Sequence, residues 1–180
     1  TRLNTDEDNS PLLNRATQGL YPPGSTFKTL TLLEYIRENS NYNDYSFKCK
    51  GQLSIDDYKI NCHNKKVHGV QDIKRAFANS CNSAFADIGL SLDIKSLRSL
   101  CKSMLFNTEL PVTLQYKQSS FSLKQSNDTG EKMQTFIGQG RTLITPLHNL
   151  LIISQRPSAH MTGEKLSILK KKNQRNTLYS

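Results

Sequence analysis

The sequence predicts a mainly helical domain of the α+β class with a small β-hairpin. Two stretches, 27–36 and 94–105, carry apolar residues at the three- and four-residue spacing of an amphipathic helix. Two shorter stretches, 45–49 and 58–62, alternate polar and apolar residues around a turn-prone segment, which is typical of paired strands. With 180 residues, of which 36% are hydrophobic, the chain can bury one good core.

A rigid turn precedes the first of these helices. Pro22 and Pro23 fix φ and cannot continue a preceding helix, and Gly24 permits an unusual backbone conformation. We therefore expect Ser25 at or near the N-cap of the helix. Because positions three residues apart share a helix face, the Lys28 amine would lie beside the Ser25 hydroxyl.

This pair has a chemical interpretation and a purely structural one. A serine hydroxyl is a poor nucleophile until a base takes its proton, and burial lowers the pKa of a lysine far enough to make it that base. The structural alternative is a serine cap followed by a solvated lysine. The spacing alone does not decide, since Ser-x-x-Lys recurs at 99–102 and 167–170. The Pro-Pro-Gly entry adds support for catalysis, and both interpretations stay open on these residues.

The cysteines offer no clear function from the sequence. Cys49 and Cys62 could lie opposite each other on the predicted hairpin, so a disulfide between them stays an open alternative. Together with His63 and His68 they fit no zinc spacing, and the sequence predicts no metal site. Cys81 and Cys101 are expected in the core, and no base can be named that would make Cys81 a nucleophile.

Helices are expected on both sides of a Ser-Cys-Asn step at 80–82. His68 would cap or pack at the start of a helix over 70–79, and Asp93 would be the N-cap of the helix over 94–105. The polar stretch 106–130 is expected to be a long loop. Three apolar residues should face inward from the helix over 70–79: Ile73, Ala76 and Phe77.

The third notable stretch is Gly-Gln-Gly at 138–140, followed by Thr-Pro-Leu at 145–147. Thr145 is expected as an N-cap and Pro146 as the first residue of a helix. No Lys-Ser/Thr follows the glycines, so nucleotide binding is not predicted.

Three motifs in the same order closely resemble the transpeptidase domain of penicillin-binding proteins. They are Ser25-x-x-Lys28, Ser80-x-Asn82 and the stretch 137–147, and the resemblance runs from about residue 10 to about residue 154. It implies an α+β fold with an antiparallel sheet packed by helices, the sheet lying largely outside this chain. It also implies three units: a linker at 1–10, a partial transpeptidase domain at 11–154 and a basic tail at 155–180, disordered or unrelated to the family.

The resemblance further implies acyl transfer to and from a serine. Ser25 would attack the carbonyl of a D-Ala-D-Ala stem peptide, Lys28 would take its proton, Ser80 would relay a proton to the leaving group and Asn82 would hold the substrate backbone. The family cross-links peptidoglycan on the outer face of the bacterial membrane, is acylated by β-lactam antibiotics and needs no metal or organic cofactor. The parent protein would be anchored in that membrane.

The chain departs from the family pattern in one motif. No Lys-Thr-Gly occurs in it, and the nearest string, Met161-Thr162-Gly163, lacks the cation. In the family, the strand that bears Lys-Thr-Gly supplies one of the two backbone N–H groups of the oxyanion hole. Losing one such donor costs on the order of 10²–10³ in rate. Two alternatives to an active transpeptidase therefore stay open: an inactive truncated remnant, and a relative that senses or hydrolyses β-lactams.

Charge and hydropathy exclude other classes. Of the net charge of +9, +5 lies in the stretch from Arg156 onward, which holds six basic residues and one acidic residue. The rest of the chain carries only +4, an ordinary net charge for a domain of this length. Without interleaved aromatic residues this tail does not predict nucleic-acid binding. No apolar run approaches the roughly 20 residues of a membrane helix, no signal peptide is recognisable, and the polar start is expected to be part of a longer protein.

Overall fold

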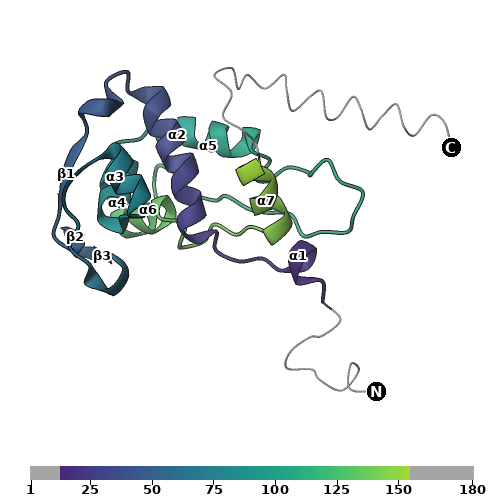
Figure 1. Cartoon of the computed structure of the whole chain (residues 1–180). Coiled ribbons are helices and arrows are strands. Elements are labelled where there is room, and N and C mark those ends of the chain that lie inside the picture. Colours follow the sequence, from purple (N-terminus) through teal and green to yellow (C-terminus); the bar gives the residue numbers. More distant parts are fainter. Residues whose placement is uncertain (1–12, 155–180) are drawn as a thin grey trace.

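The computed structural model describes residues 13–154 (Figure 1). The linker expected over 1–10 and the basic tail expected over 155–180 lie outside the described residues. The helices of the described part are α1 (Arg15–Gln18), α2 (Lys28–Glu38), α3 (Ile73–Ala78), α4 (Asn82–Leu90), α5 (Ile94–Ser103), α6 (Thr129–Phe136) and α7 (Pro146–Ser154). The strands are β1 (Ser46–Cys49), β2 (Gln52–Ile55), β3 (Tyr58–Asn61) and β4 (Gly69–Asp72).

The strands form two small antiparallel sheets, so the fold is α+β as predicted. β1 pairs with β4, with Cys49 opposite Gly69, and β2 pairs with β3. The prediction that 45–49 pairs with 58–62 was therefore wrong. The segment expected to be only a turn contains β2, and a two-residue turn at 56–57 joins β2 directly to β3, which leaves β1 to pair with the strand that follows.

The turn before α2 differs from the expectation in one detail. A 3₁₀ turn, η2 (Gly24–Phe27), leads without a break into α2, and Pro23 is the residue that flanks it. Ser25 was expected at or near the N-cap, and it lies two residues after Pro23, inside the 3₁₀ turn rather than at the cap itself. The tighter turn still places Ser25 and Lys28 on one side, because side chains at i and i+3 eclipse in a 3₁₀ helix.

Two glycines meet behind the Ser25 turn. The Gly24 amide donates to the Gly138 carbonyl oxygen at 2.7 Å, and a Cβ atom on Gly138 would overlap the Gly24 carbonyl oxygen. Gly138 also has φ +77°, a conformation that side chains rarely adopt. This close approach fixes the position of the Gly-Gln-Gly segment relative to the turn that carries Ser25.

Helix α2 runs through the middle of the described part (Figure 1) and contributes to both hydrophobic clusters of the core, with Leu30 in one and Leu32 packed against the other. On one side it packs against α4, which in turn packs against α6, and on the other side it packs against α5. Phe27 at its start stacks on Phe121 of the long loop at a centroid distance of 5.7 Å. The Thr31 hydroxyl donates to the Phe136 carbonyl at 3.0 Å, which ties α2 to the end of α6.

The segment before the Ser-Cys-Asn step is shorter as a helix than predicted. Residues 69–72 form β4, and α3 begins only at Ile73, with the Asp72 carboxylate accepting from the Arg75 amide as its cap. Ile73 and Ala76 are buried as expected, but Phe77 is 42% exposed. Phe77 lies in the last turn of a six-residue helix, where its ring contacts Phe85 without being covered further.

Several helix ends agree with their sequence signals. Asp93 caps α5 by accepting from the Ser96 amide, and Thr145 accepts from the amide of His148 as α7 begins at Pro146. The long loop after α5 is confirmed, with β-bridge pairing only around Ser120. None of the helices in residues 13–154 is long and apolar enough to span a membrane.

Candidate active site

The four residues predicted for the site come together from three parts of the chain. Ser25 lies in the 3₁₀ turn, Lys28 begins α2, and Ser80 and Asn82 flank the junction of α3 and α4. The Lys28 amine contacts the hydroxyls of Ser25 at 3.2 Å and of Ser80 at 2.9 Å. The Ser80 hydroxyl donates to the Ser25 hydroxyl at 2.9 Å, so the two hydroxyls and the amine form a closed triangle.

Lys28 is the centre of this arrangement and is almost fully buried, at 1% exposure. Besides the two hydroxyls, its amine donates to the Ser80 carbonyl at 2.7 Å and to the Asn82 side-chain oxygen at 2.7 Å. A charged amine has three N–H groups and no lone pair, fewer donors than these four partners. A neutral amine keeps two N–H groups for the carbonyl and amide oxygens and accepts a hydroxyl proton with its lone pair.

Burial also changes the protonation of this amine. Desolvation lowers the pKa of Lys28 from 10.5 to about 8, and the thiols of Cys81 and Cys62 oppose the shift only in part. Ser25, in contrast, is exposed. An amine whose pKa is lowered toward neutral pH therefore lies directly behind an exposed hydroxyl, the arrangement that general-base activation of a serine requires.

The backbone around Ser80 is held in an uncommon conformation. Ser80 has φ +48°, in the left-handed region that a residue with a side chain seldom occupies. Hydrogen bonds fix it on both sides, from the Ser80 amide to the Phe77 carbonyl at 2.9 Å and from the Cys81 amide to the Ala76 carbonyl at 3.0 Å. This turn aims the Ser80 hydroxyl at Ser25 and its carbonyl at Lys28.

Asn82 has a fixed amide orientation. Its side-chain oxygen accepts from the Lys28 amine, and its side-chain nitrogen donates to the Asn61 carbonyl at 2.9 Å. The amide is partly exposed and borders the same cleft as Ser25. It keeps one N–H for a further acceptor in the cleft.

A cleft of about 510 Å³ opens over these residues. Several of its lining residues were not predicted from the sequence, including Lys66, Asn79 and Gln139. Gln139 could have been anticipated from the glycines on both sides of it in the sequence. Both adopt positive φ and turn the backbone there. The full lining is Ser25, His63, Lys66, His68, Asn79, Ser80, Asn82, Ile137 and Gln139.

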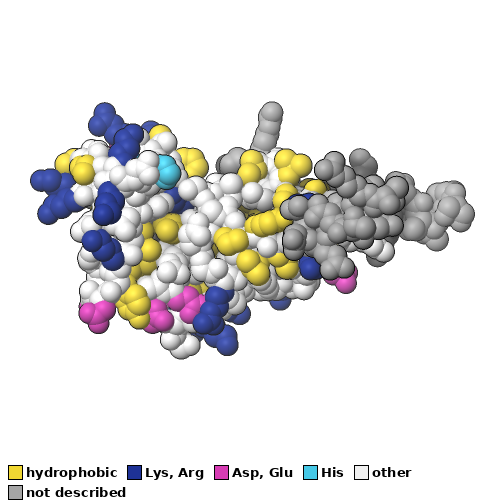
Figure 2. Space-filling view, turned by 90° about the horizontal axis from the view of Figure 1, so that it is seen from below, with side chains coloured by type: hydrophobic (Ala, Val, Ile, Leu, Met, Phe, Trp, Pro, Cys, Tyr) yellow, Lys and Arg dark blue, Asp and Glu magenta, His cyan; other side chains and the backbone are white. Residues whose placement is uncertain are grey.

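Basic side chains gather on one face of the end that carries the strands. Figure 2 shows Lys and Arg side chains around an exposed His on this face, with acidic side chains at its lower edge. Lys66 belongs to the cleft itself. The exposed lysines of the strand segment are Lys48, Lys50, Lys59, Lys65 and Lys66.

The structure answers two open questions about cysteine and histidine. The Sγ atoms of Cys49 and Cys62 lie 3.7 Å apart, far beyond the roughly 2.05 Å of a disulfide, and both thiols are free. His68 does not cap α3, which begins five residues later; its Nδ1 lies 3.3 Å from the Cys49 sulfur. Cys81 and Cys101 are buried as predicted.

Relatives of known sequence share this site-bearing segment. Stage V sporulation protein D of Bacillus subtilis is 30% identical over 137 residues, which cover 74% of this chain and 21% of that protein. The peptidoglycan D,D-transpeptidase PbpA of Mycolicibacterium smegmatis is 30% identical over 152 residues, covering 80% of this chain and 30% of that protein. The chain thus spans less than a third of the length of these relatives.

The fold is shared with solved structures of the same group. The penicillin G acyl-enzyme complex of penicillin-binding protein A from M. tuberculosis superposes with a TM-score of 0.74 at 27% identity, over 84% of this chain and 35% of that one. The profile of the family described as penicillin binding protein transpeptidase domain matches residues 2–155. A chain with this fold, this profile and these motifs in this order belongs to the penicillin-binding protein transpeptidase family.

Proposed function

We propose that this chain is the serine-bearing part of a D,D-transpeptidase of peptidoglycan cross-linking, acting by acyl transfer through Ser25. The observation that carries the proposal is the triangle of the Ser25 and Ser80 hydroxyls with the buried amine of Lys28. The amine is desolvated, which lowers its pKa to about 8, and the nucleophile is open to the cleft. The relatives named as peptidoglycan D,D-transpeptidases support this choice of reaction.

In the first half of the proposed reaction, neutral Lys28 takes the proton of the Ser25 hydroxyl. The serine oxygen then attacks the carbonyl carbon of a D-Ala-D-Ala peptide bond, and the Ser25 amide polarises the carbonyl oxygen. When the bond to the terminal D-Ala breaks, its amine receives the proton from Lys28 through the Ser80 hydroxyl, which contacts the Lys28 amine and the Ser25 hydroxyl, both at 2.9 Å. The product is an ester between Ser25 and the donor peptide.

The second half reverses these proton movements. The amine of an acceptor stem peptide loses a proton to Lys28 by way of Ser80 and attacks the ester carbonyl. Ser25 leaves and recovers its proton from Lys28, which completes the cross-link. Asn82 holds the donor peptide backbone with its free N–H, and its oxygen keeps Lys28 in place.

The charge of the cleft agrees with the proposed substrates. A D-Ala-D-Ala peptide and a β-lactam both end in a carboxylate, and Lys66 supplies a cation in the cleft. The lining residues described in the structure include no Asp or Glu that could activate a water, which favours transfer to an amine over hydrolysis of a β-lactam.

We place the site on the extracytoplasmic side of the bacterial membrane, where peptidoglycan is cross-linked, and propose that the whole protein is anchored there. The penicillin-binding proteins that resemble it include one solved as a penicillin G acyl-enzyme, and we propose that β-lactams acylate Ser25 in the same way. The proposed extent of the domain is 11–154.

Acylation by a fluorescent penicillin tests the proposal. The purified full chain is incubated with the reagent and read by gel fluorescence and intact mass, beside Ser25→Ala and the matched control Ser99→Ala, which alters a second Ser-x-x-Lys on the exposed side of α5. We expect one adduct in the wild type and in Ser99→Ala and none in Ser25→Ala. A folded wild-type chain that takes no label would be an inactive remnant, and rapid loss of the label by hydrolysis would indicate a β-lactamase-like relative.

A further inference from the structure

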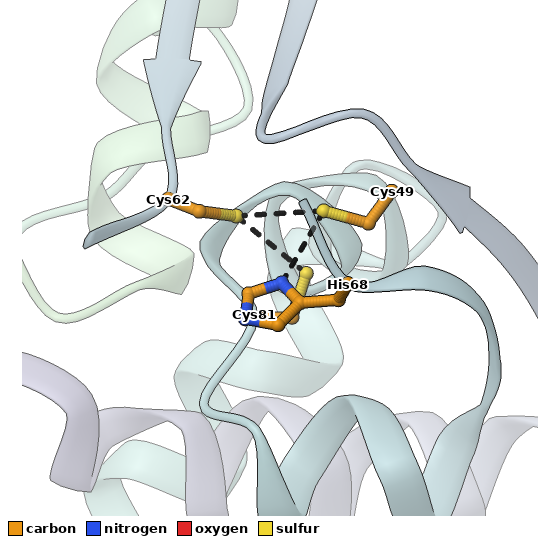
Figure 3. A group of neighbouring side chains, drawn as sticks. All are labelled: Cys49, Cys62, His68 and Cys81. Carbon is orange, nitrogen blue, oxygen red and sulfur yellow. Dashed lines mark hydrogen bonds between the residues drawn. The ribbon is translucent and has the colours of Figure 1, made fainter. Parts of the chain in front are cut away.

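Four side chains that the proposed reaction does not use converge beneath the cleft. Cys49 ends β1, Cys62 follows β3, His68 precedes β4 and Cys81 caps α4 (Figure 3). Their sulfur and nitrogen atoms all lie within 4.8 Å of one another. The three cysteines are buried and His68 is half-buried. The sequence prediction of no metal site considered Cys49, Cys62, His63 and His68. It left out Cys81, which takes the place of His63 in the observed group.

The spacing of these atoms is that of a tetrahedral metal site. Zinc bonds of about 2.3 Å to sulfur and 2.0–2.1 Å to nitrogen place two sulfurs about 3.8 Å apart, and a sulfur and a nitrogen about 3.5 Å apart. The Cys62 sulfur lies 3.7 Å from the sulfurs of Cys49 and Cys81, and the Cys49 sulfur lies 3.3 Å from His68 Nδ1. Three edges of the group thus match a shared central ion.

The surroundings of the sulfurs are those that thiolates need. The Gly51 amide donates to the Cys49 sulfur at 3.3 Å and the Ala84 amide donates to the Cys81 sulfur at 3.5 Å. The hydroxyl of Ser83 lies 3.2 Å from the Cys62 sulfur. Outer hydrogen bonds of this kind orient metal ligands and offset their negative charge.

We propose that Cys49, Cys62, His68 and Cys81 bind a Zn²⁺ ion. Thiolate and imidazole ligands suit zinc and disfavour Mg²⁺ and Ca²⁺, which take oxygen ligands. Four protein ligands fill a tetrahedral shell and leave no position for water or substrate, so the ion is structural rather than catalytic. The site stands on its own geometry and does not depend on the proposed transpeptidase reaction.

The ion would also position the residues of the cleft, a consequence that does rest on the proposed function. Cys81 lies between Ser80 and Asn82 in the chain, so an ion on its sulfur anchors both residues from below. The same ion ties α4 to the ends of β1 and β3. The ion would add to the two backbone hydrogen bonds that hold Ser80 at φ +48°.

Metal content is the first test. The full chain is expressed with zinc in the medium, purified under reducing conditions without chelator, and analysed by elemental mass spectrometry beside Cys81→Ser and Cys101→Ser. Cys101 is a buried cysteine outside the group, so Cys101→Ser controls for the loss of any core thiol. We expect about one zinc per chain in the wild type and in Cys101→Ser, and at least a tenfold loss in Cys81→Ser.

A spectroscopic test covers the case in which Cys81→Ser does not fold. Wild-type chain stripped of metal is titrated with Co²⁺, and we expect a thiolate-to-cobalt charge-transfer band and the intense visible bands of tetrahedral cobalt, saturating at one ion per chain and displaced by Zn²⁺. Absence of both zinc and these bands overturns the site, as does a Cys49–Cys62 disulfide found by peptide mass in a protein purified without reductant.

Penicillin labelling then separates the site from the function. Metal-loaded and metal-stripped wild type are labelled side by side, and we expect at least a tenfold slower acylation of Ser25 in the stripped protein, restored by Zn²⁺. Zinc binding without any labelling in either form would leave the metal site intact and refute the proposed function. Equal labelling of both forms would refute the positioning of Ser80 and Asn82 by the ion.

Discussion

Acylation of Ser25 should follow the titration of Lys28. The Lys28 amine is the base in the proposed reaction and acts only when neutral, and its burial lowers the pKa from 10.5 to about 8. We expect the second-order rate of penicillin acylation to rise about tenfold per pH unit below pH 8 and to level off above it. Replacing Lys28 by Arg, whose charge is permanent, should abolish labelling at every pH.

The size of the effect follows from the pKa shift. At pH 7 a lysine with a pKa of about 8 is neutral in about one molecule in ten, whereas a lysine at 10.5 is neutral in about one in 3,000. Burial therefore raises the amount of active base about 300-fold. The same burial destabilises the folded state when Lys28 is charged. Between pH 8 and 10.5 the unfolded chain binds more protons than the folded one, so the free energy of unfolding should increase as pH rises through this range.

The assay is time-resolved labelling with a fluorescent penicillin between pH 6 and 10, with circular dichroism at each pH to confirm that the chain stays folded. The reasoning would be refuted by a flat profile from pH 6 to 9, or by a rate that keeps rising to pH 10. Either result would mean that burial does not set the protonation of the base, or that Lys28 is not the base.

Three substitutions test the structure and one tests the cleft. Gly138→Ala should lower the free energy of unfolding by more than about 1 kcal/mol and slow Ser25 labelling, because its Cβ would overlap the Gly24 carbonyl. Thr31→Val removes the hydrogen bond to the Phe136 carbonyl and should cost about 1–2 kcal/mol by denaturant unfolding. Asp93→Ala removes the cap of α5 and should cost about 1 kcal/mol in the same assay. Lys66→Gln should slow penicillin labelling several-fold at low salt and little at high salt, since it removes a cation of the cleft; an equal loss at both would argue against charge attraction.

The sequence predicted helices better than strand pairing. Amphipathic spacing and local caps are properties of one segment, so α2 and α5 were found close to their observed ends. Alternation identifies a strand but not its partner, and the partner of β1 is set by the short turn that joins β2 to β3. The burial of Phe77 could not be predicted for a similar reason, because it depends on where α3 ends.

The candidate site was predicted in its residues but not in its surroundings. Ser25, Lys28, Ser80 and Asn82 were recognisable because their order and spacing form motifs. Their cleft also includes Lys66 and other side chains from separate turns, which no local spacing connects. The cysteine and histidine group was missed for the same reason: each ligand comes from a different element, whereas zinc motifs in sequences are recognised by closely spaced pairs.

The hydrogen bonds of Lys28 also bear on when the protein becomes reactive. Its amine joins the start of α2 to a carbonyl 52 residues further along the chain, a contact that forms only after the intervening segment has closed. Before that closure the amine is hydrated and charged, and Ser25 has no partner to remove its proton. In the proposed mechanism, the Ser25 hydroxyl therefore becomes nucleophilic only after the segment between Lys28 and Ser80 has folded.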